Sequence, residues 1–220
     1  MTVTGHAAEA KDSIESIVAD RRISEVLHFT TNLGLLGVLG TSAILSRKRL
    51  PEEKYVEHIY TPNCSTRKDR AWLDYVNLSI SRINDSMFDA SKRWHEVDNV
   101  WWAALSFEAG ILSDPGVYFT TTNNIYPSVR RATGADGLNA MFADVVSGRY
   151  SQPMARFAGQ SASWTTDRQA EVLYPGRLSL VKLQRVYVRE EHHADDISGW
   201  FASFPSTPAV PVVCAPEVFT

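Results

Sequence analysis

A single carboxylate inside an apolar, strand-like run is the feature that most constrains how this chain can fold. Glu171 lies at the centre of the string Gln-Ala-Glu-Val-Leu at residues 169–173. Burying an unpaired charge there would cost on the order of several kcal/mol. We therefore expect Glu171 to face a solvent-filled cleft or to have a functional role. The alternative is a glutamate at a strand edge that is bonded to an arginine.

Length and composition predict one ordinary globular domain. The chain has 220 residues, of which 44% are hydrophobic and 21% are charged, so it can bury a sizeable core. The net charge of −3 argues against a general nucleic-acid coat protein, although it leaves room for a local basic groove. We expect a loose tail and a short helix over residues 1–22, and a single domain over residues 23–220.

The sequence also predicts a cytoplasmic protein. Its first residues are polar and contain no apolar signal segment, and no apolar run approaches the roughly 18 residues of a membrane span. Cys64 and Cys214 lie far apart and do not have the spacing of metal ligands. We therefore expect reduced thiols and no association with a membrane.

Hydrophobic patterning indicates an α+β fold. Strands are predicted at residues 26–30, 43–46, 73–81, 100–105, 116–119, 169–173, 183–188 and 210–213. Helices are predicted at residues 11–22, 33–39 and near 138–146. Residues 51–71 are predicted to be a surface loop. The long connection at 120–168 contains few strand signals, and connections of that length are often functional.

Two strings near strands carry candidate site residues. Leu27-His28-Phe29-Thr30 places an imidazole on an early strand, although a core histidine satisfied by the backbone is the alternative. Arg82 and Asn84 follow the strand at 73–81 and would point into a cleft. An arginine there can hold a pyrophosphate through two parallel hydrogen bonds, or it is an ordinary surface residue in a turn.

Basic and acidic clusters complete the set of candidates. One cluster consists of Arg130, Arg131, Arg149, Arg156 and Arg168 with Tyr150, Phe157 and Trp164 among them. It is either a track with stacking platforms for a single strand or a solvated loop. Residues 190–196 (Glu-Glu-His-His-Ala-Asp-Asp) do not predict a metal site, because adjacent histidines on a strand or loop point apart.

A histidine-containing strand near the start and a lone glutamate late in the chain are the layout of ADP-ribosyltransferases. The residues of both strings resemble motifs of the DarT family of DNA ADP-ribosyltransferase toxins. The resemblance extends from about Ile23 to near Phe219. The strings that carry it are Leu27–Thr30 with Leu45-Ser46, Tyr75–Leu78, Val117–Asn123 and Gln169–Leu173. The last string is the most specific.

The resemblance implies an ADP-ribosyltransferase-like fold, in which two small packed sheets with flanking helices enclose a cleft for NAD. It implies an enzyme that uses NAD as co-substrate and needs no metal. The implied reaction transfers ADP-ribose to a base of single-stranded DNA, usually thymidine, and releases nicotinamide. The implied partner is a macrodomain antitoxin similar to DarG. RNA, another DNA base or a protein remain alternative targets.

The resemblance also assigns roles to individual residues. Glu171 would be the catalytic carboxylate. The cofactor-binding residues would be His28, Phe29, Thr30, Gly37, Leu45 and Arg82. The catalytic arginine of the family follows the Tyr-Val strand, and Arg82 is the nearest candidate. Better-known members read more like Tyr-Val-Pro-Phe-Tyr-Phe there, whereas residues 77–84 differ. Arg93 is therefore the fallback, and the target base is open.

Overall fold

The structure is a computed structural model that describes residues 13–50, 70–95 and 99–220. Eight strands pair in the order β12-β11-β4-β1-β3-β9-β5-β6. The first four are β12 (Val212–Cys214), β11 (Leu183–Val188), β4 (Trp102–Glu108) and β1 (Glu25–Thr31). The other four are β3 (Tyr75–Ile80), β9 (Val172–Pro175), β5 (Tyr118–Thr120) and β6 (Arg131–Thr133). β11 and β12 are parallel, whereas the other neighbours in this order are antiparallel.

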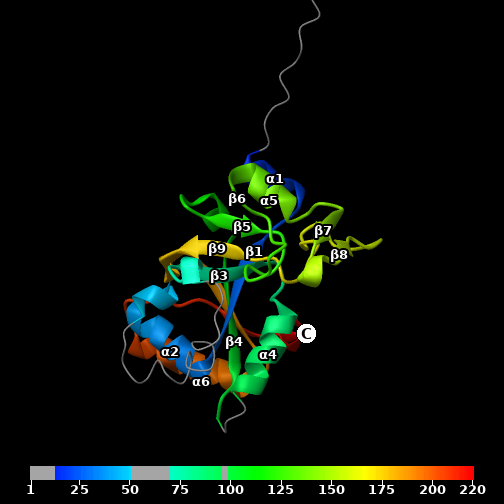
Figure 1. Cartoon of the computed structure of the whole chain (residues 1–220). Helices are drawn as coiled ribbons and strands as arrows, with labels where there is room; N and C mark the ends of the chain where they lie inside the picture. The colour runs from blue at the N-terminus through cyan, green and yellow to red at the C-terminus, as the bar shows by residue number, and fades with distance from the viewer. Residues whose placement is uncertain (1–12, 51–69, 96–98) are drawn as a thin grey trace, which may run out of the picture.

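The two halves of this sheet meet at a corner between β1 and β3. Their register consists of Val26 opposite Ile80 and Leu27 opposite Ser79. Beyond this corner the strands separate, and Figure 1 shows β1 and β4 running across the direction of β3 and β9. The two small sheets expected from the sequence are thus present, joined through the short β1–β3 pairing.

The two faces of β1 serve two different cores. Successive side chains of a strand point to opposite faces, so Val26 packs into the main core while Leu27 packs into a smaller one. The smaller core also contains Phe88 and Phe219, and Phe29 packs against it. β1 is therefore covered on both faces, which fixes its register and the direction of every side chain along it.

Five α-helices lie around these sheets in the part of the chain that the structure describes. They are α1 (Ile14–Asp20), α2 (Asn32–Thr41), α4 (Asp85–Trp94), α5 (Gly134–Ala140) and α6 (Glu191–Ser203). α2 follows β1 directly, and the Thr31 hydroxyl caps it by accepting a hydrogen bond from the Gly34 amide at 3.1 Å. The helix predicted at residues 33–39 is therefore present and begins one residue earlier, at Asn32.

α1 belongs to the folded domain. Ile17 is 3% exposed and is part of the main core, because α1 packs beside α5. The domain start predicted at residue 23 stays a prediction, and the packing of Ile17 favours a boundary at the N-terminus of α1. The tail predicted at residues 1–10 lies outside the described residues.

Two helices were not predicted. α4 replaces the turn expected after β3, with Asn84 as its N-cap and Phe88 and Ser91 as its buried residues. α6 covers residues 190–196, which we expected to form a strand, loop or turn. The prediction that His192 and His193 point apart is therefore wrong, because their ring centroids are 4.0 Å apart. Both helices begin with polar residues and bury few side chains, so their sequences give a weak helical pattern.

The connection at 120–168 contains more structure than its sequence indicates. The helix predicted near 138–146 is α5, which ends at Ala140, and β7 (Val145–Ser147) follows it and pairs with β8 (Pro153–Ala155). A further small sheet pairs β2 (Ala43–Leu45) with β10 (Arg177–Ser179). Of the predicted loop at 51–71, residues 51–69 lie outside the described part.

Two further observations concern membrane spans and cysteines. No helix in the described ranges is both long and apolar enough to cross a membrane. Cys214 in β12 is a free thiol, whereas Cys64 lies outside the described residues.

The contact of α5 with β6 allows a test of the packing. A Cβ on Gly137 would lie 2.5 Å from the Ala132 carbonyl oxygen. We expect Gly137→Ala to destabilise the fold by about 1–3 kcal/mol, because the backbone must shift. In Gly199→Ala of α6 the Cβ meets nothing within 4 Å. That control is expected to gain about 0.5–1 kcal/mol from helix propensity. Thermal unfolding measures both, and equal melting temperatures would contradict the packing.

Candidate active site

A cavity of about 300 Å³ lies where β1 and β3 separate. Residues Leu27–Thr31 of β1 and Tyr75–Ser79 of β3 line it, and α4 forms a further wall. Ile44, Leu45 and Arg47 line it from β2 and the turn after it. Glu171 also lines the cavity, so the cleft predicted from its charge exists.

Glu171 is held in place at both carboxylate oxygens. The side-chain amide of Asn77 donates to Oε1 at 3.0 Å, and the backbone amide of Asn124 donates to Oε2 at 2.7 Å. Glu171 is 8% exposed and directly precedes β9, rather than lying within the strand as its string predicts. Its backbone is also fixed, because Thr120 exchanges hydrogen bonds with it. Hydrogen bonds to the charged form make a buried carboxylate tolerable.

His28 is tied to the same asparagine. Its Nδ1 lies 3.0 Å from the backbone oxygen of Asn77. Because a carbonyl oxygen only accepts hydrogen bonds, we assign the ring proton to Nδ1. Burial lowers the pKa of His28 below its usual range, and the hydrogen bond to Asn77 opposes this only in part. A neutral imidazole with an unprotonated Nε2 is thus favoured in the cavity wall.

The other predicted cofactor-binding residues divide into two groups. Phe29, Thr30 and Leu45 line the cavity together with His28. Phe29 packs edge-to-face on Trp102, with 5.8 Å between the ring centroids. Gly37 lies in α2 and does not line the cavity. The binding roles of all four residues stay predictions.

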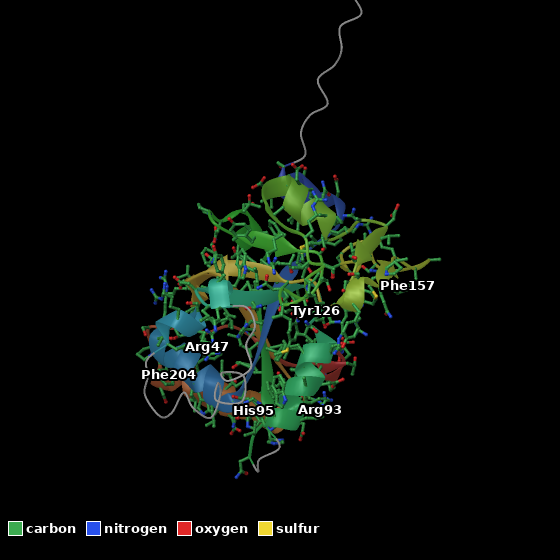
Figure 2. The ribbon with its side chains drawn as sticks, viewed as in Figure 1. Arg47, Arg93, His95, Tyr126, Phe157 and Phe204 are labelled. Atoms are coloured by element: carbon green, nitrogen blue, oxygen red, sulfur yellow. The ribbon has the colours of Figure 1, made fainter. Side chains whose placement is uncertain are left out.

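The arginines lie differently from the expectation. Neither Arg82 nor Arg93 lines the cavity, whereas Arg47 does. In Figure 2, Arg47 lies on the side of α2 and Arg93 on the side of α4. Sequence reasoning missed Arg47 as a site residue, although it follows the matched string Leu45-Ser46 directly.

Arg82 lies against the connection at 120–168. Its guanidinium carbon is 4.5 Å from the centre of the Trp164 ring, and Nη2 donates to the Thr165 carbonyl at 3.4 Å. Burial and the nearby charge of Arg168 lower the pKa of Arg82 to about 10. Ser81, which directly precedes Arg82, has a φ of 60°, a left-handed conformation that is uncommon outside glycine.

Arg131, a member of the basic cluster, supports Asn124. Its Nε donates to the Asn124 side-chain oxygen at 2.6 Å, and its Nη2 donates to the Asn124 backbone oxygen. Since the Asn124 amide holds Glu171, Arg131 positions the carboxylate indirectly. This arrangement has no local sequence signal.

Two aromatic residues of the connection at 120–168 are exposed to solvent. Tyr150 is 78% and Phe157 59% exposed, and Figure 2 shows Phe157 at the outer edge of the molecule beyond β8.

Within the described ranges, no group of three or more His, Cys, Asp or Glu side chains is arranged to hold a metal ion.

This fold, with a histidine strand and a fixed glutamate beside one cavity, defines an ADP-ribosyltransferase-like protein. The family model described as ssDNA thymidine ADP-ribosyltransferase, DarT, matches residues 27–220. The chain therefore belongs to the DarT family. No match is found among curated proteins.

Solved structures agree on the fold. The Thermus sp. 2.9 DarT in complex with NAD+ is 15% identical, with a TM-score of 0.64 over 90% of this chain and 98% of that one. The same protein in complex with ADP-ribosylated ssDNA is 15% identical, with a TM-score of 0.63 over 90% and 97%. Thermosipho africanus DarTG in complex with ADP-ribose is 12% identical, with a TM-score of 0.55 over 89% of this chain and 51% of that one. At such identities the likeness shows the fold alone.

The Asn77 amide provides a test of the site. Asn77→Ala removes one charge-assisted hydrogen bond from Glu171, worth about 1.5–3 kcal/mol. We expect kcat for ADP-ribosyl transfer to fall roughly 10- to 100-fold. The melting temperature should also fall, by about 2–4 °C for each kcal/mol lost. Asn32→Ala is the matched control, because Asn32 bonds Asn99 and does not line the cavity. Similar kcat losses in both variants would argue against this role of Asn77.

Proposed function

We propose that this chain transfers ADP-ribose from NAD to a thymidine base of single-stranded DNA and releases nicotinamide. The observation that carries the proposal is the Glu171 carboxylate, held by Asn77 and Asn124 at the wall of the cavity. Membership of residues 27–220 in the DarT family supports the same reaction.

The residues around the cavity fit NAD as a substrate. Glu171 would accept a hydrogen bond from the 2-hydroxyl of the nicotinamide ribose. The same carboxylate would stabilise the positive charge that develops on the ribose when the glycosidic bond breaks and nicotinamide takes the bonding electrons. A nitrogen of the target base then forms the new bond to that carbon and loses its proton. The base must be unstacked to reach the site, which favours a single strand.

We propose different partners for the two arginines. Arg47 lines the cavity and would pair with the pyrophosphate of NAD, since a guanidinium binds phosphate oxygens in pairs. Arg82, stacked beside Trp164 outside the cavity, would contact the DNA strand or the reacting base. Arg82 thus remains a candidate for catalysis, through the DNA rather than through NAD.

We also propose a cytoplasmic toxin that is countered by a macrodomain antitoxin similar to DarG. NAD and DNA are both available in that compartment. The fold similarity to DarTG of Thermosipho africanus in complex with ADP-ribose supports a partner that handles the same group.

The central test is transfer of label from NAD to single-stranded DNA oligonucleotides, with RNA and protein as parallel acceptors. We expect label on DNA with the native chain and a loss of roughly 100-fold or more with Glu171→Gln, because the amide carries no charge. NAD binding and the melting temperature should change little. Label on RNA or protein alone would move the target to another class, and undiminished transfer by Glu171→Gln would refute the catalytic assignment.

The two arginines can be separated by kinetics. We expect Arg47→Gln to raise KM for NAD about 10-fold, and Arg82→Gln to raise KM for DNA, because each loses charge-assisted hydrogen bonds to a different substrate. Arg93→Gln is the matched control, because Arg93 is exposed and lies outside the cavity lining. If Arg82→Gln changed KM for NAD instead, the assignment of the two arginines would be reversed.

A further inference from the structure

The α4 wall of the cavity contains a buried histidine with an unused ring nitrogen. His95 follows α4 as its C-cap, is 9% exposed and lines the cavity. Its Nδ1 lies 2.8 Å from the Ser91 carbonyl oxygen, whereas its Nε2 has no hydrogen-bond partner among the residues that the structure describes. Since the carbonyl can only accept, we assign the ring proton to Nδ1. Nε2 of the neutral ring is then an acceptor without a donor.

An unsatisfied buried acceptor is uncommon in a folded protein and needs an explanation. Packing does not explain the free Nε2, because Ser91 and the edge of Trp102 already fix the ring of His95 without it. The His95 and Trp102 ring centroids are 5.6 Å apart and the planes are nearly perpendicular. The histidine is thus held in one orientation, which is the arrangement expected of a group that meets a ligand.

The surroundings of His95 indicate what kind of ligand group it meets. Large uncharged side chains line the cavity from β1, α4 and β4, namely Phe29, Met87, Trp94 and Trp102. The charged lining residues, Arg47 and Glu171, come from other elements. A flat aromatic ring fits such a wall, whereas a phosphate does not, because phosphate oxygens only accept hydrogen bonds at neutral pH. The ligand group should therefore be a ring that carries an N–H donor.

We propose that His95 is a specificity-determining residue that accepts a hydrogen bond from an exocyclic amino group on one ring of NAD. Two groups have this chemistry, the carboxamide of the nicotinamide ring and the 6-amino group of adenine. The proposal rests on the proposed function only in taking NAD as the ligand. His95 thereby distinguishes NAD from dinucleotides that lack the donor.

Ligand analogues identify the atom that His95 meets. 3-Acetylpyridine adenine dinucleotide replaces the carboxamide nitrogen by a methyl group, and nicotinamide hypoxanthine dinucleotide replaces the 6-amino group by an oxygen. We expect the native chain to bind one of the two about tenfold more weakly than NAD, the effect of one net hydrogen bond. Calorimetric titration without DNA measures all three constants.

Variants then assign the effect to His95. His95→Phe keeps a ring but removes the acceptor, so NAD should bind about tenfold more weakly and the discrimination against that analogue should vanish. His95→Gln places an amide oxygen near the position of Nε2 and should retain part of the discrimination. It also provides the test if His95→Phe fails to fold.

Two results would overturn the proposal. The first is equal binding of NAD and both analogues by the native chain, and the second is discrimination that persists unchanged in His95→Phe and His95→Gln. Transfer of label to DNA, measured separately, keeps the proposed function distinct. A native chain that discriminates through His95 but labels no polymer refutes the transferase and leaves the binding role intact. A native chain that does not bind NAD refutes both.

Discussion

The structure of the site depends on one asparagine that joins the two sheets. Asn77 accepts a hydrogen bond from His28 through its backbone oxygen and donates one to Glu171 through its side chain. His28 is a residue of β1, whereas Glu171 immediately precedes β9. β1 and β3 pair only at Val26 and Leu27 and then separate. Their ladder therefore does not fix the distance between His28 and Glu171, and Asn77 does. The opening that forms the cavity is also what makes the asparagine necessary.

This arrangement explains how an apolar run tolerates a charge. Glu171 lies directly before β9, where its backbone pairs with Thr120 and its carboxylate turns into the cavity. Neutral N–H groups hold the carboxylate, and the Arg131 guanidinium fixes Asn124, which provides one of them. The support is built before any substrate arrives, so little reorganisation is needed when positive charge develops nearby.

Local pattern predicts the parts of this site that lie on single strands. The strand around His28 follows from alternation, and the cleft beside Glu171 follows from the cost of a buried charge. Asn77 could not be predicted, because its partners are 49 and 94 residues away in the chain. Arg47 lines the cavity and Arg82 does not, which could not be predicted because Arg82 follows β3 directly whereas Arg47 comes from the turn after β2. α4 was missed because one short polar helix with few apolar positions resembles a turn.

The electrostatics of the cavity suit a positive charge that develops on the ribose of NAD. In the proposed reaction the ribose becomes positive, so a second cation beside Glu171 would oppose the step that we assign to the carboxylate. Burial lowers the pKa of His28 and keeps its ring neutral at neutral pH, so the group nearest to Asn77 adds no such charge. His28 becomes cationic only when the pH falls below that lowered pKa. The desolvation of one histidine and the hydrogen bonds of one glutamate therefore act together, and Asn77 links both.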